Sequence, residues 1–306
     1  MKKFIALLLA LMLVFAFVAC SENGGKNDDD DEDEDETASV EESNEDEEDG
    51  EGLEITFEET VVVDNEFCKI TITDIVPDNS MGYTLNVSLE NKGAQTYTFG
   101  VGDTAINGVQ CMAMFSQDVG AGKKANEEIV FFEEDFYGND IGEYTDVKLE
   151  FIAYDDEYNE VMSETVHVYP CGEENAATYV REDKETDVVI VDNEYVKVIV
   201  TDYTYDKHTS YSEYCANLYI ESKTDYIISV DTDDVSVNGY MIDPYYAEYI
   251  YPGNTVFSSV AWDESEFDEN GIKEVEEIEF ILNICNPNAE SYTEYYLSQD
   301  SIKLNP

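Results

Sequence analysis

Basic side chains are scarce in this sequence of 306 residues, where 15 Lys and Arg face 72 Asp and Glu and the net charge is −57. Binding to nucleic acid relies on basic side chains that neutralise phosphates, and an anionic bilayer surface repels an acidic protein. The composition therefore argues against nucleic acid as a partner. Cations, cationic partners, neutral polymers or no specific partner remain.

Residues that carry enzyme chemistry are also scarce. The only histidines are His167 and His208, and there is no Gly-x-Ser-x-Gly motif, no His-Glu-x-x-His motif and no phosphate-binding glycine loop. Catalysis needs a nucleophile, an acid–base pair or a metal held by neighbouring side chains. We expect an outward strand position for His167, an exposed loop position for His208, no enzyme activity and no cofactor.

Helical periodicity is nearly absent from the sequence. Apolar residues instead alternate with polar ones in short segments, as in Cys68-Lys69-Ile70-Thr71-Ile72 and Val196-Lys197-Val198-Ile199-Val200. A period of two is typical of half-buried strands, and turn sequences such as Asn107-Gly108 separate the segments. The sequence therefore predicts an all-β protein.

The first twenty residues have the features of an export signal. Met1-Lys2-Lys3 precede sixteen uninterrupted apolar residues, Phe4 to Ala19, a run shorter than the about 20 residues of a membrane span. The run ends at Phe17-Val18-Ala19-Cys20, which resembles the lipobox of bacterial lipoproteins, although Leu is more common at the position of Phe17. The resemblance implies lipidation of Cys20 and a membrane anchor on the extracellular side without a transmembrane helix. An ordinary secretory peptide is the alternative.

An acidic segment follows the leader. Residues 21–52 contain 18 Asp or Glu, a single basic residue, Lys26, and almost no apolar residues. Such a segment cannot bury enough surface to offset the entropy of ordering, and its charges repel one another. We interpret it as a disordered linker that spaces the folded part from the membrane. A cation-binding tail and a docking segment for a basic partner are the alternatives.

The remainder of the chain is a duplication. Residues 63–74 (VDNEFCKITITD) return as residues 191–202 (VDNEYVKVIVTD), and Asn107-Gly108 returns as Asn238-Gly239. The offset between the copies grows from 128 to 131, which predicts a three-residue insertion near Lys207-His208. Each copy has about 105 to 110 residues and seven or more expected strands, which is the size of an immunoglobulin-like β-sandwich.

We therefore predict two tandem immunoglobulin-like β-sandwich domains after a signal peptide and a disordered acidic linker. The predicted parts are a signal peptide (1–19), the lipidated cysteine and acidic linker (20–52), repeat 1 (53–170), a linker (171–187) and repeat 2 (188–306).

Four segments of the two copies are similar to segments of a known family. They are Gly82 to Asn91 (GYTLNVSLEN), Gly122 to Asn126 (GKKAN), Val235 to Gly239 (VSVNG) and Gly271 to Phe280 (GIKEVEEIEF). The segments resemble a family of immunoglobulin-like domains on Gram-positive bacterial lipoproteins. The resemblance covers both copies and implies the fold and the location. The family is one of unknown function, so it implies neither an activity nor a site.

The cysteines do not form a repeated framework, because five follow Cys20 and none recurs at the same position of both copies. Cys215 lies at the start of one expected strand and Cys285 at the end of another. If these strands are antiparallel neighbours in the sandwich, the two sulfurs lie side by side. The sequence therefore leaves two alternatives for this pair, a disulfide or two free thiols. The sequence has no Cys-x-x-Cys motif that would suggest a zinc site.

Acidic clusters recur at similar places in the copies, at Glu133-Glu134-Asp135 and Asp263-Glu264-x-Glu266, and repeat 2 adds Asp231-x-Asp233-Asp234. Calcium binds several oxygen ligands in one loop. None of the clusters matches the twelve-residue calcium loop, and ordinary surface acidity explains them equally well. We expect no dedicated metal site and at most weak calcium binding at the surface.

Differences between the copies indicate where a function was added. Tyr249 and Tyr251 stand where repeat 1 has Asp118 and Gly120, and the alternation with Ile250, which is expected in the core, turns both tyrosines to solvent. Exposed aromatic rings stack on sugars or anchor protein interfaces. The simpler explanation is that tyrosine suits strands in a chain with 23 of them.

Taken together, these features predict a cell-surface lipoprotein that binds or adheres to an unknown protein or envelope component and has no catalytic role. Two alternatives remain open. The first is a carbohydrate-binding module that uses Tyr249 and Tyr251 of repeat 2. The second is a structural or accessory envelope lipoprotein without a dedicated ligand.

Overall fold

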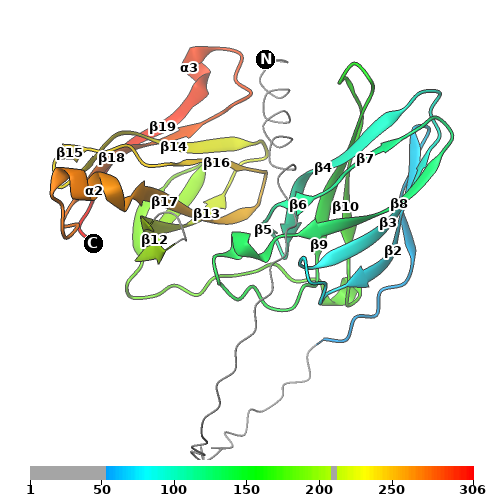
Figure 1. Cartoon of the computed structure of the whole chain (residues 1–306), viewed down its shortest axis with the longest axis horizontal. Coiled ribbons are helices and arrows are strands. Elements are labelled where there is room, and N and C mark those ends of the chain that lie inside the picture. Colours follow the sequence, from blue (N-terminus) through cyan, green and yellow to red (C-terminus); the bar gives the residue numbers. More distant parts are fainter. Residues whose placement is uncertain (1–52, 208–211) are drawn as a thin grey trace, which may run out of the picture. The chain divides into compact units, whose positions relative to one another are not determined.

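Alternating apolar side chains build the strands of this protein, which is all-β. The computed structural model describes residues 53–207 and 212–306 (Figure 1). In β2 (Cys68–Val76), the side chains of Cys68, Ile70 and Ile72 are fully buried. One buried face on each strand is what two packed antiparallel sheets require. The signal peptide, Cys20 and the acidic linker lie outside the described residues.

Repeat 1 is a sandwich of two antiparallel sheets. The first sheet has the order β1 (Thr60–Asp64), β2, β3 (Thr84–Asn91), β8 (Lys124–Phe131) and β6 (Ala113–Met114). In the facing sheet, β10 (Glu160–Val168), β9 (Val147–Tyr154) and β4 (Tyr97–Ile106) are neighbours, and both β5 (Val109–Gln110) and β7 (Ser116–Val119) pair with β4. The 3-10 helix η1 (Glu133–Phe136) follows β8, and η2 (Glu173–Asn175) follows β10.

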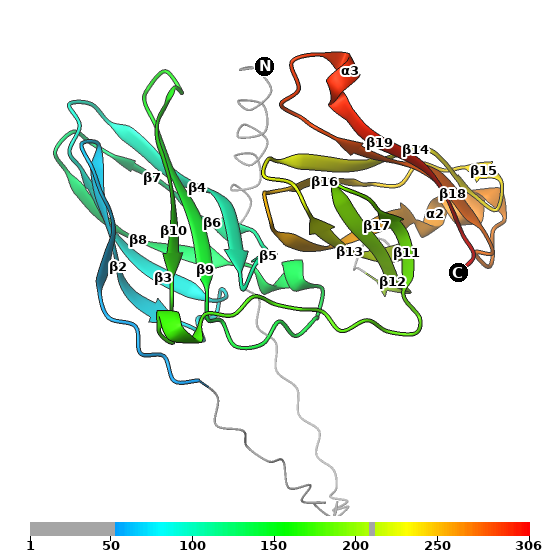
Figure 2. The same ribbon diagram turned by 180° about the vertical axis from the view of Figure 1, so that it is seen from behind.

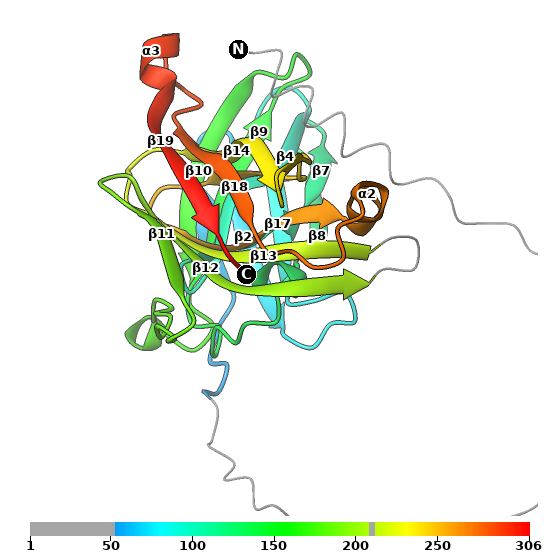
Figure 3. The ribbon, with the colours of Figure 1, turned by 90° about the vertical axis from the view of Figure 1, so that its left-hand side faces the viewer.

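Repeat 2 has the same topology, which Figure 2 shows from behind. One sheet contains β11 (Val188–Asp192), β12 (Val196–Lys207), β13 (Ser212–Ser222) and β17 (Thr255–Asp263). The other contains β19 (Tyr296–Leu304), β18 (Ile278–Cys285) and β14 (Ile228–Val237), with β15 (Tyr240–Met241) and β16 (Ala247–Ile250) both on β14. Helix α2 (Glu264–Asn270) takes the place of η1, and α3 (Tyr292–Tyr295) precedes β19, which runs beside β18 to the C-terminus (Figure 3).

The strand register confirms the duplication inferred from the sequence. The β1–β2 pairing shifts between Val61 and Val63, and the β11–β12 pairing shifts between Val189 and Val191, which lie 128 residues later. The turn that follows is also shared. Asn65 accepts hydrogen bonds from two backbone N–H groups of its turn, and Asn193 does the same in repeat 2. A bulge is a specified feature of a strand, so equal bulges at equal positions mark two copies of one structure.

The insertion lies in the hairpin between β12 and β13. The pairing of β2 with β3 ends at Val76 and Thr84, whereas that of β12 with β13 continues to Lys207 and Ser212. The hairpin of repeat 2 is therefore longer, as the change of offset predicts. His208 and the rest of residues 208–211 lie outside the described residues.

Each sandwich has its own apolar core. Trp262 on β17 fills the centre of repeat 2 at the position that Phe131 occupies on β8 of repeat 1. The core of repeat 1 also includes three side chains of repeat 2, Ile199, Tyr219 and Phe257. Residues 53–306 accordingly form one compact unit. Within this described part, no helix is long and apolar enough to cross a membrane.

Candidate functional site

The two tyrosines proposed as ligand contacts have different surroundings. Tyr249 on β16 is 50% exposed and pairs with Ser229, while the adjacent Ile250 is fully buried in the core. Tyr249 therefore faces solvent, as the alternation predicts. Tyr245, on the connection before β16, is 84% exposed and is thus more open to solvent than Tyr249. The strand pattern did not indicate Tyr245, because it lies outside the alternating segment.

Tyr251 is less open to solvent than the sequence predicts. Its side chain is half-buried, and burial raises the pKa of its hydroxyl, as do the nearby Asp103, Glu150 and Tyr154 of repeat 1. The backbone around it is also engaged. Gln110 donates from Nε2 to the carbonyl of Tyr249 (2.8 Å) and accepts at Oε1 from the backbone N–H of Tyr251 (3.0 Å). Tyr251 thus belongs to a contact between the repeats.

The contact begins with a short strand pairing. Val109 of β5 pairs in parallel with Thr255 of β17, and the Thr255 N–H donates to the carbonyl of Gly108 at 2.9 Å. Through this pair, the sheet of repeat 1 that contains β4 is continuous with the sheet of repeat 2 that contains β13. Backbone pairing of this kind leaves fewer unpaired groups at a strand edge.

A buried polar network lies beside the strand pairing. The Lys148 ammonium lies 2.7 Å from the Asp103 carboxylate, with both side chains largely shielded from solvent. Asn254 of repeat 2 completes the network, since it accepts from Lys148 Nζ at 2.6 Å and donates to Asp103 Oδ1 at 2.9 Å. A buried charge pair needs such additional hydrogen bonds to offset the cost of desolvation. The amide of Asn254 therefore stabilises the ion pair of the other repeat.

Aromatic side chains form the apolar part of the contact. Tyr179, from the linker, packs edge to face on Phe257 with ring centroids 5.8 Å apart and on Tyr219 with centroids 6.5 Å apart. Ile199 lies in the same cluster. The equivalent residues on β2, β3 and β8 of repeat 1 are polar, namely Thr71, Ser88 and Asn126. This difference between the copies is the signal from which the contact could have been found in the sequence.

The linker is ordered by an ion pair. Arg181 donates from two nitrogens to the two carboxylate oxygens of Asp187, both at 2.7 Å, and the side chains are almost fully buried. The hydrogen bonds from Arg181 hold the pKa of Asp187 below its usual value. The guanidinium also lies 5.6 Å from the ring centroid of Tyr219, within the range of a cation–π interaction. Arg181 and Tyr179 of the linker thus both pack on Tyr219 of repeat 2.

Two carboxylates are partly buried near this contact. Burial raises the pKa of Glu248 on β16, and the charge of Asp135 on η1 of repeat 1 raises it further. Burial also raises the pKa of Asp135. Glu248 accepts a hydrogen bond from Ser258 at 2.9 Å. Burial is thus the main reason that the charged form of Glu248 is disfavoured, and the charge of Asp135 adds to it.

Removing the charge of Glu248 is expected to stabilise the protein. Because the folded state raises the pKa of Glu248 above the value of 4.5 in the unfolded chain, the ionised carboxylate destabilises the fold above that folded-state pKa. Glu248→Gln should raise the free energy of unfolding at pH 7 by about 1 kcal/mol. The gain should shrink as the pH falls through the folded-state pKa and vanish below the unfolded one.

Urea unfolding at pH 7 and in the acid range measures this gain. Glu128→Gln, on an exposed position of β8, is the matched control and should change little at either pH. A loss of stability in Glu248→Gln at pH 7, or a gain that persists in acid, would contradict the assignment.

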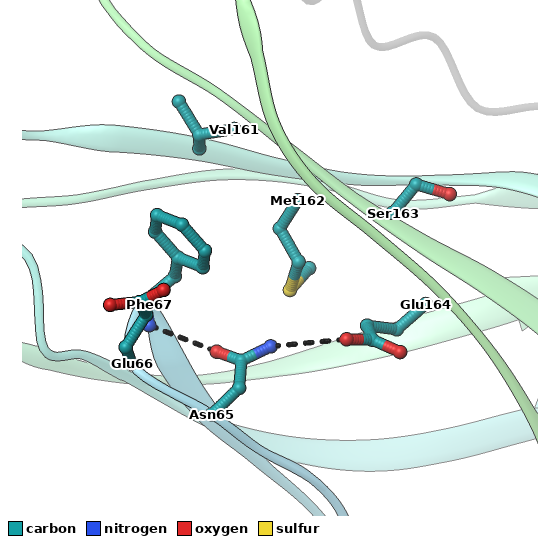
Figure 4. Close-up of a pocket in the computed structure, with 7 residues that line it drawn as sticks. All are labelled: Asn65, Glu66, Phe67, Val161, Met162, Ser163 and Glu164. Carbon is teal, nitrogen blue, oxygen red and sulfur yellow. Dashed lines mark hydrogen bonds between the residues drawn. The ribbon is translucent and has the colours of Figure 1, made fainter.

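A pocket lies at the end of repeat 1. Asn65, Glu66 and Phe67 of the β1–β2 turn and residues 161–164 of β10 line an open pocket of about 430 Å³ (Figure 4). Asn65 accepts from the Phe67 N–H at 2.9 Å and donates to Glu164 at 3.4 Å. The first of these bonds recurs at Asn193, so Asn65 serves the turn. The pocket offers two carboxylates, an aromatic ring and a thioether, without a convergent polar group for chemistry.

The remaining candidates are dispersed. His167 is partly exposed on β10, as predicted, with Nδ1 2.7 Å from Asp146 Oδ1 and its ring stacked on Tyr169. Glu133-Glu134-Asp135 lies at η1, Asp263 caps α2, and Asp231 accepts from Asn283 on the outer face of β14. Among residues 53–207 and 212–306, no group of three His, Cys, Asp or Glu side chains is arranged to hold a metal ion.

The predicted neighbourhood of Cys215 and Cys285 is wrong. Cys215 lies on β13, whose partners are β12 and β17, whereas Cys285 lies on β18, whose partners are β14 and β19. The two strands belong to different sheets, and sheets in a sandwich are about 10 Å apart, too far for a disulfide between outward-pointing side chains. Cys285 is a buried thiol that forms no disulfide with Cys215.

Comparisons with known proteins identify no family. No protein-family profile matches the chain, and no curated protein matches it. Similar solved structures include the YadV chaperone (11% identity, 73% of this chain and 92% of that chain, TM-score 0.22) and a protein of unknown function from Porphyromonas gingivalis (11%, 75% and 93%, 0.21). Another is the Salmonella enterica SafA pilin in complex with the SafB chaperone (12%, 80% and 100%, 0.23). At such scores these likenesses say nothing about function, and the sheet topology defines the sandwich.

Proposed function

We propose that this chain is a lipid-anchored cell-surface protein that works by binding a protein or envelope component through repeat 2. The observation that carries the proposal is the exposure of Tyr245 (84%) and Tyr249 (50%), which lie four residues apart in the chain. Tyr205 and Tyr240 of repeat 2 are also exposed, and the other described aromatic side chains of repeat 2 are buried or half-buried. Aromatic side chains supply contact area at a low cost in conformational entropy, and they dominate many binding sites. A non-catalytic, adhesion-like role fits this surface best.

The proposed location rests on the start of the chain. Two lysines, sixteen apolar residues and Cys20 follow one another as in a lipoprotein signal. Acyl chains on Cys20 would anchor the protein to the membrane, and residues 21–52 would space repeats 1 and 2 from it. Growth in labelled palmitate, with Cys20→Ala as the control, tests this part separately.

Carbohydrate is the second candidate ligand, because polar side chains lie on the same outer face as Tyr249. Asn283 donates to Asp231 at 2.8 Å, and Gln299 donates to Asn283 at 2.9 Å, which forms a row of amides and a carboxylate across β14, β18 and β19. Asp231 lies two positions from Ser229, the partner of Tyr249. Asn283 is only 3% exposed, so the groups that can bind sugar hydroxyls are Gln299, which is exposed, and Asp231, which is partly exposed, while an aromatic ring beside them can stack on the sugar.

Loss of the tyrosine rings is expected to weaken ligand binding. Tyr249→Ala and Tyr245→Ala should each reduce the affinity for the ligand by roughly tenfold, which corresponds to about 1.4 kcal/mol. A glycan array and a pull-down from envelope extract provide the ligand, and titration of the parent and variants provides the affinities. Asp118→Ala, at the position in repeat 1 that corresponds to Tyr249, is the control and should bind as the parent does.

Two outcomes would count against the binding role. The absence of any saturable ligand for the parent would favour an accessory lipoprotein without a dedicated ligand. A ligand whose affinity is unchanged in both tyrosine variants would move the site away from repeat 2. Tyr251→Phe should leave the affinity for the ligand unchanged, because the backbone of Tyr251 takes part in the contact between the repeats and its side chain is half-buried.

A further inference from the structure

The contact between the repeats joins two different surfaces. Repeat 1 contributes the hairpin of β4 and β5 with Val109 and Gln110, which we call the hairpin end. Repeat 2 contributes Asn254 and Thr255 at the start of β17, which we call the strand end. Because the repeats are copies, each has both surfaces. The hairpin end of repeat 2 and the strand end of repeat 1 therefore stay outside the internal contact.

The second hairpin end has the same backbone as the first. Tyr240 pairs with Val237 in repeat 2 as Val109 pairs with Ile106 in repeat 1. The turns also match, since Asn238 and Asn107 have φ values of 50° and 51° and a glycine follows each. The exposure differs, because Val109 is fully buried, whereas Tyr240 is 48% and Met241 is 67% exposed. Repeat 2 thus presents apolar side chains where repeat 1 has a covered strand.

The charges on the two unoccupied ends are complementary. At the hairpin end of repeat 2, Glu279 stands where repeat 1 has Lys148, beside Asp234 at the position of Asp103, and Glu279 also contacts Lys303 of β19 at 3.0 Å. At the strand end of repeat 1, Lys123 and Lys124 replace Asn254 and Thr255. Both lysines are exposed, although Lys124 also contacts Glu90 at 2.8 Å. Opposite charges on two matching surfaces favour one orientation of approach.

We propose that the hairpin end of repeat 2 docks on the strand end of repeat 1 of a second copy, in the geometry of the internal contact. Such a contact does not close on itself, so it would arrange copies head to tail in rows. It should be weaker than the internal contact, because Thr71, Ser88 and Asn126 offer no apolar face like that of repeat 2. The proposal uses neither Tyr245 nor Tyr249, so it does not depend on a ligand there.

Disulfide cross-linking tests the proposed register. The full chain carrying Cys20→Ser is purified in detergent, and a Lys124→Cys form is mixed with a Tyr240→Cys form under mild oxidation. These positions correspond to Thr255 and Val109, which are Cα partners across the internal contact. Paired positions of a sheet lie within disulfide range. The native cysteines of the described part are buried and should not interfere.

The expected result is an interchain dimer with a yield roughly tenfold above that of a collision control, because docking raises the local concentration of the two thiols. Met81→Cys, at an exposed position away from both ends, replaces Lys124→Cys in that control. Val109→Cys with Thr255→Cys in one chain is the internal standard and should form an intrachain bond. A dimer yield no higher than the control would overturn the proposal, and so would failure of the internal standard.

Charge reversal provides a second readout. Adding Lys123→Glu to the Lys124→Cys form should lower the dimer yield, and adding Glu279→Lys to the Tyr240→Cys form should restore it, because the two changes exchange the charges across the contact. A dimer yield that stays the same after both substitutions would overturn the proposal. Dimer that forms only after residues 21–52 are deleted would also overturn it, because the acidic segment would then be the occupant of the Lys123–Lys124 end.

Discussion

Asn107→Ala should destabilise repeat 1 by about 4 kcal/mol, near the upper end of single substitutions. The Asn107 side chain is 3% exposed. It donates to the carbonyls of Ile141 and Glu143 and accepts from the N–H groups of Thr145 and Asp146. Alanine would leave these buried backbone groups without partners, each at a cost of about 1 kcal/mol or more. It would also strain the backbone, since φ is 51° at this position.

The duplication provides a matched control for this substitution. Asn238 binds the equivalent loop of repeat 2 with one backbone hydrogen bond fewer, donating to the carbonyl of Glu274 and accepting from the N–H groups of Glu276 and Glu277. Its surroundings are partly open to solvent, so water can replace the lost bonds. Asn238→Ala should cost about half as much as Asn107→Ala.

Unfolding in urea measures both effects. Circular dichroism reports both repeats, and the fluorescence of Trp262, the only tryptophan, reports repeat 2. Asn107→Gly removes the side chain without the strain of a positive φ, so it should recover only part of the loss. Equal losses in the free energy of unfolding for Asn107→Ala and Asn238→Ala would show that burial does not determine how much these asparagine hydrogen bonds contribute to stability.

Trp262→Ala is the other substitution with a large expected effect, a loss of about 4 kcal/mol from repeat 2. The indole is 1% exposed, and its Nε1 donates to the carbonyl of Ile242 at 3.3 Å. Tyr214 and Phe267 pack around it with ring centroids about 6 Å away. Alanine would leave a cavity that these rigid neighbours cannot fill, and an orphan carbonyl.

Trp262→Phe is the control, because repeat 1 has Phe131 at the same position. The smaller ring keeps most of the packing and loses the hydrogen bond, so the cost should be about 1 kcal/mol. Thermal and urea unfolding by circular dichroism give both values. A loss of ligand binding without a loss of stability would instead make Trp262 part of a binding surface.

The strands and the turns could be predicted because their signals are local. Ile70 and Ile72 are buried as their alternation requires, and Asn107-Gly108 adopts the positive φ values that this pair favours in hairpins. The repeated sequence also predicts which residues of the two copies are equivalent, and the bulges that recur 128 residues apart agree with it. Each of these features depends on residues within one strand or turn.

The disposition of outward residues could not be predicted in the same way. Alternation assigns Tyr249 and Tyr251 to one face, yet Tyr249 faces solvent and Tyr251 lies against Asp103 and Glu150 of repeat 1. For Cys215 and Cys285, the segment positions were correct, but the strands belong to different sheets. The alternation of apolar and polar residues shows which side of a strand a residue occupies, but it does not show what covers that side.

Thus the order of residues alone established the all-β character, the duplication and the acidic surface, because periodicity, repetition and charge are properties of the chain. Only the folded protein decided that repeat 1 contacts repeat 2 through Val109, Gln110 and Asn254, and that the backbone of Tyr251 takes part in this contact. Those contacts join residues more than a hundred positions apart. They depend on shape and desolvation across two surfaces, which no local pattern encodes.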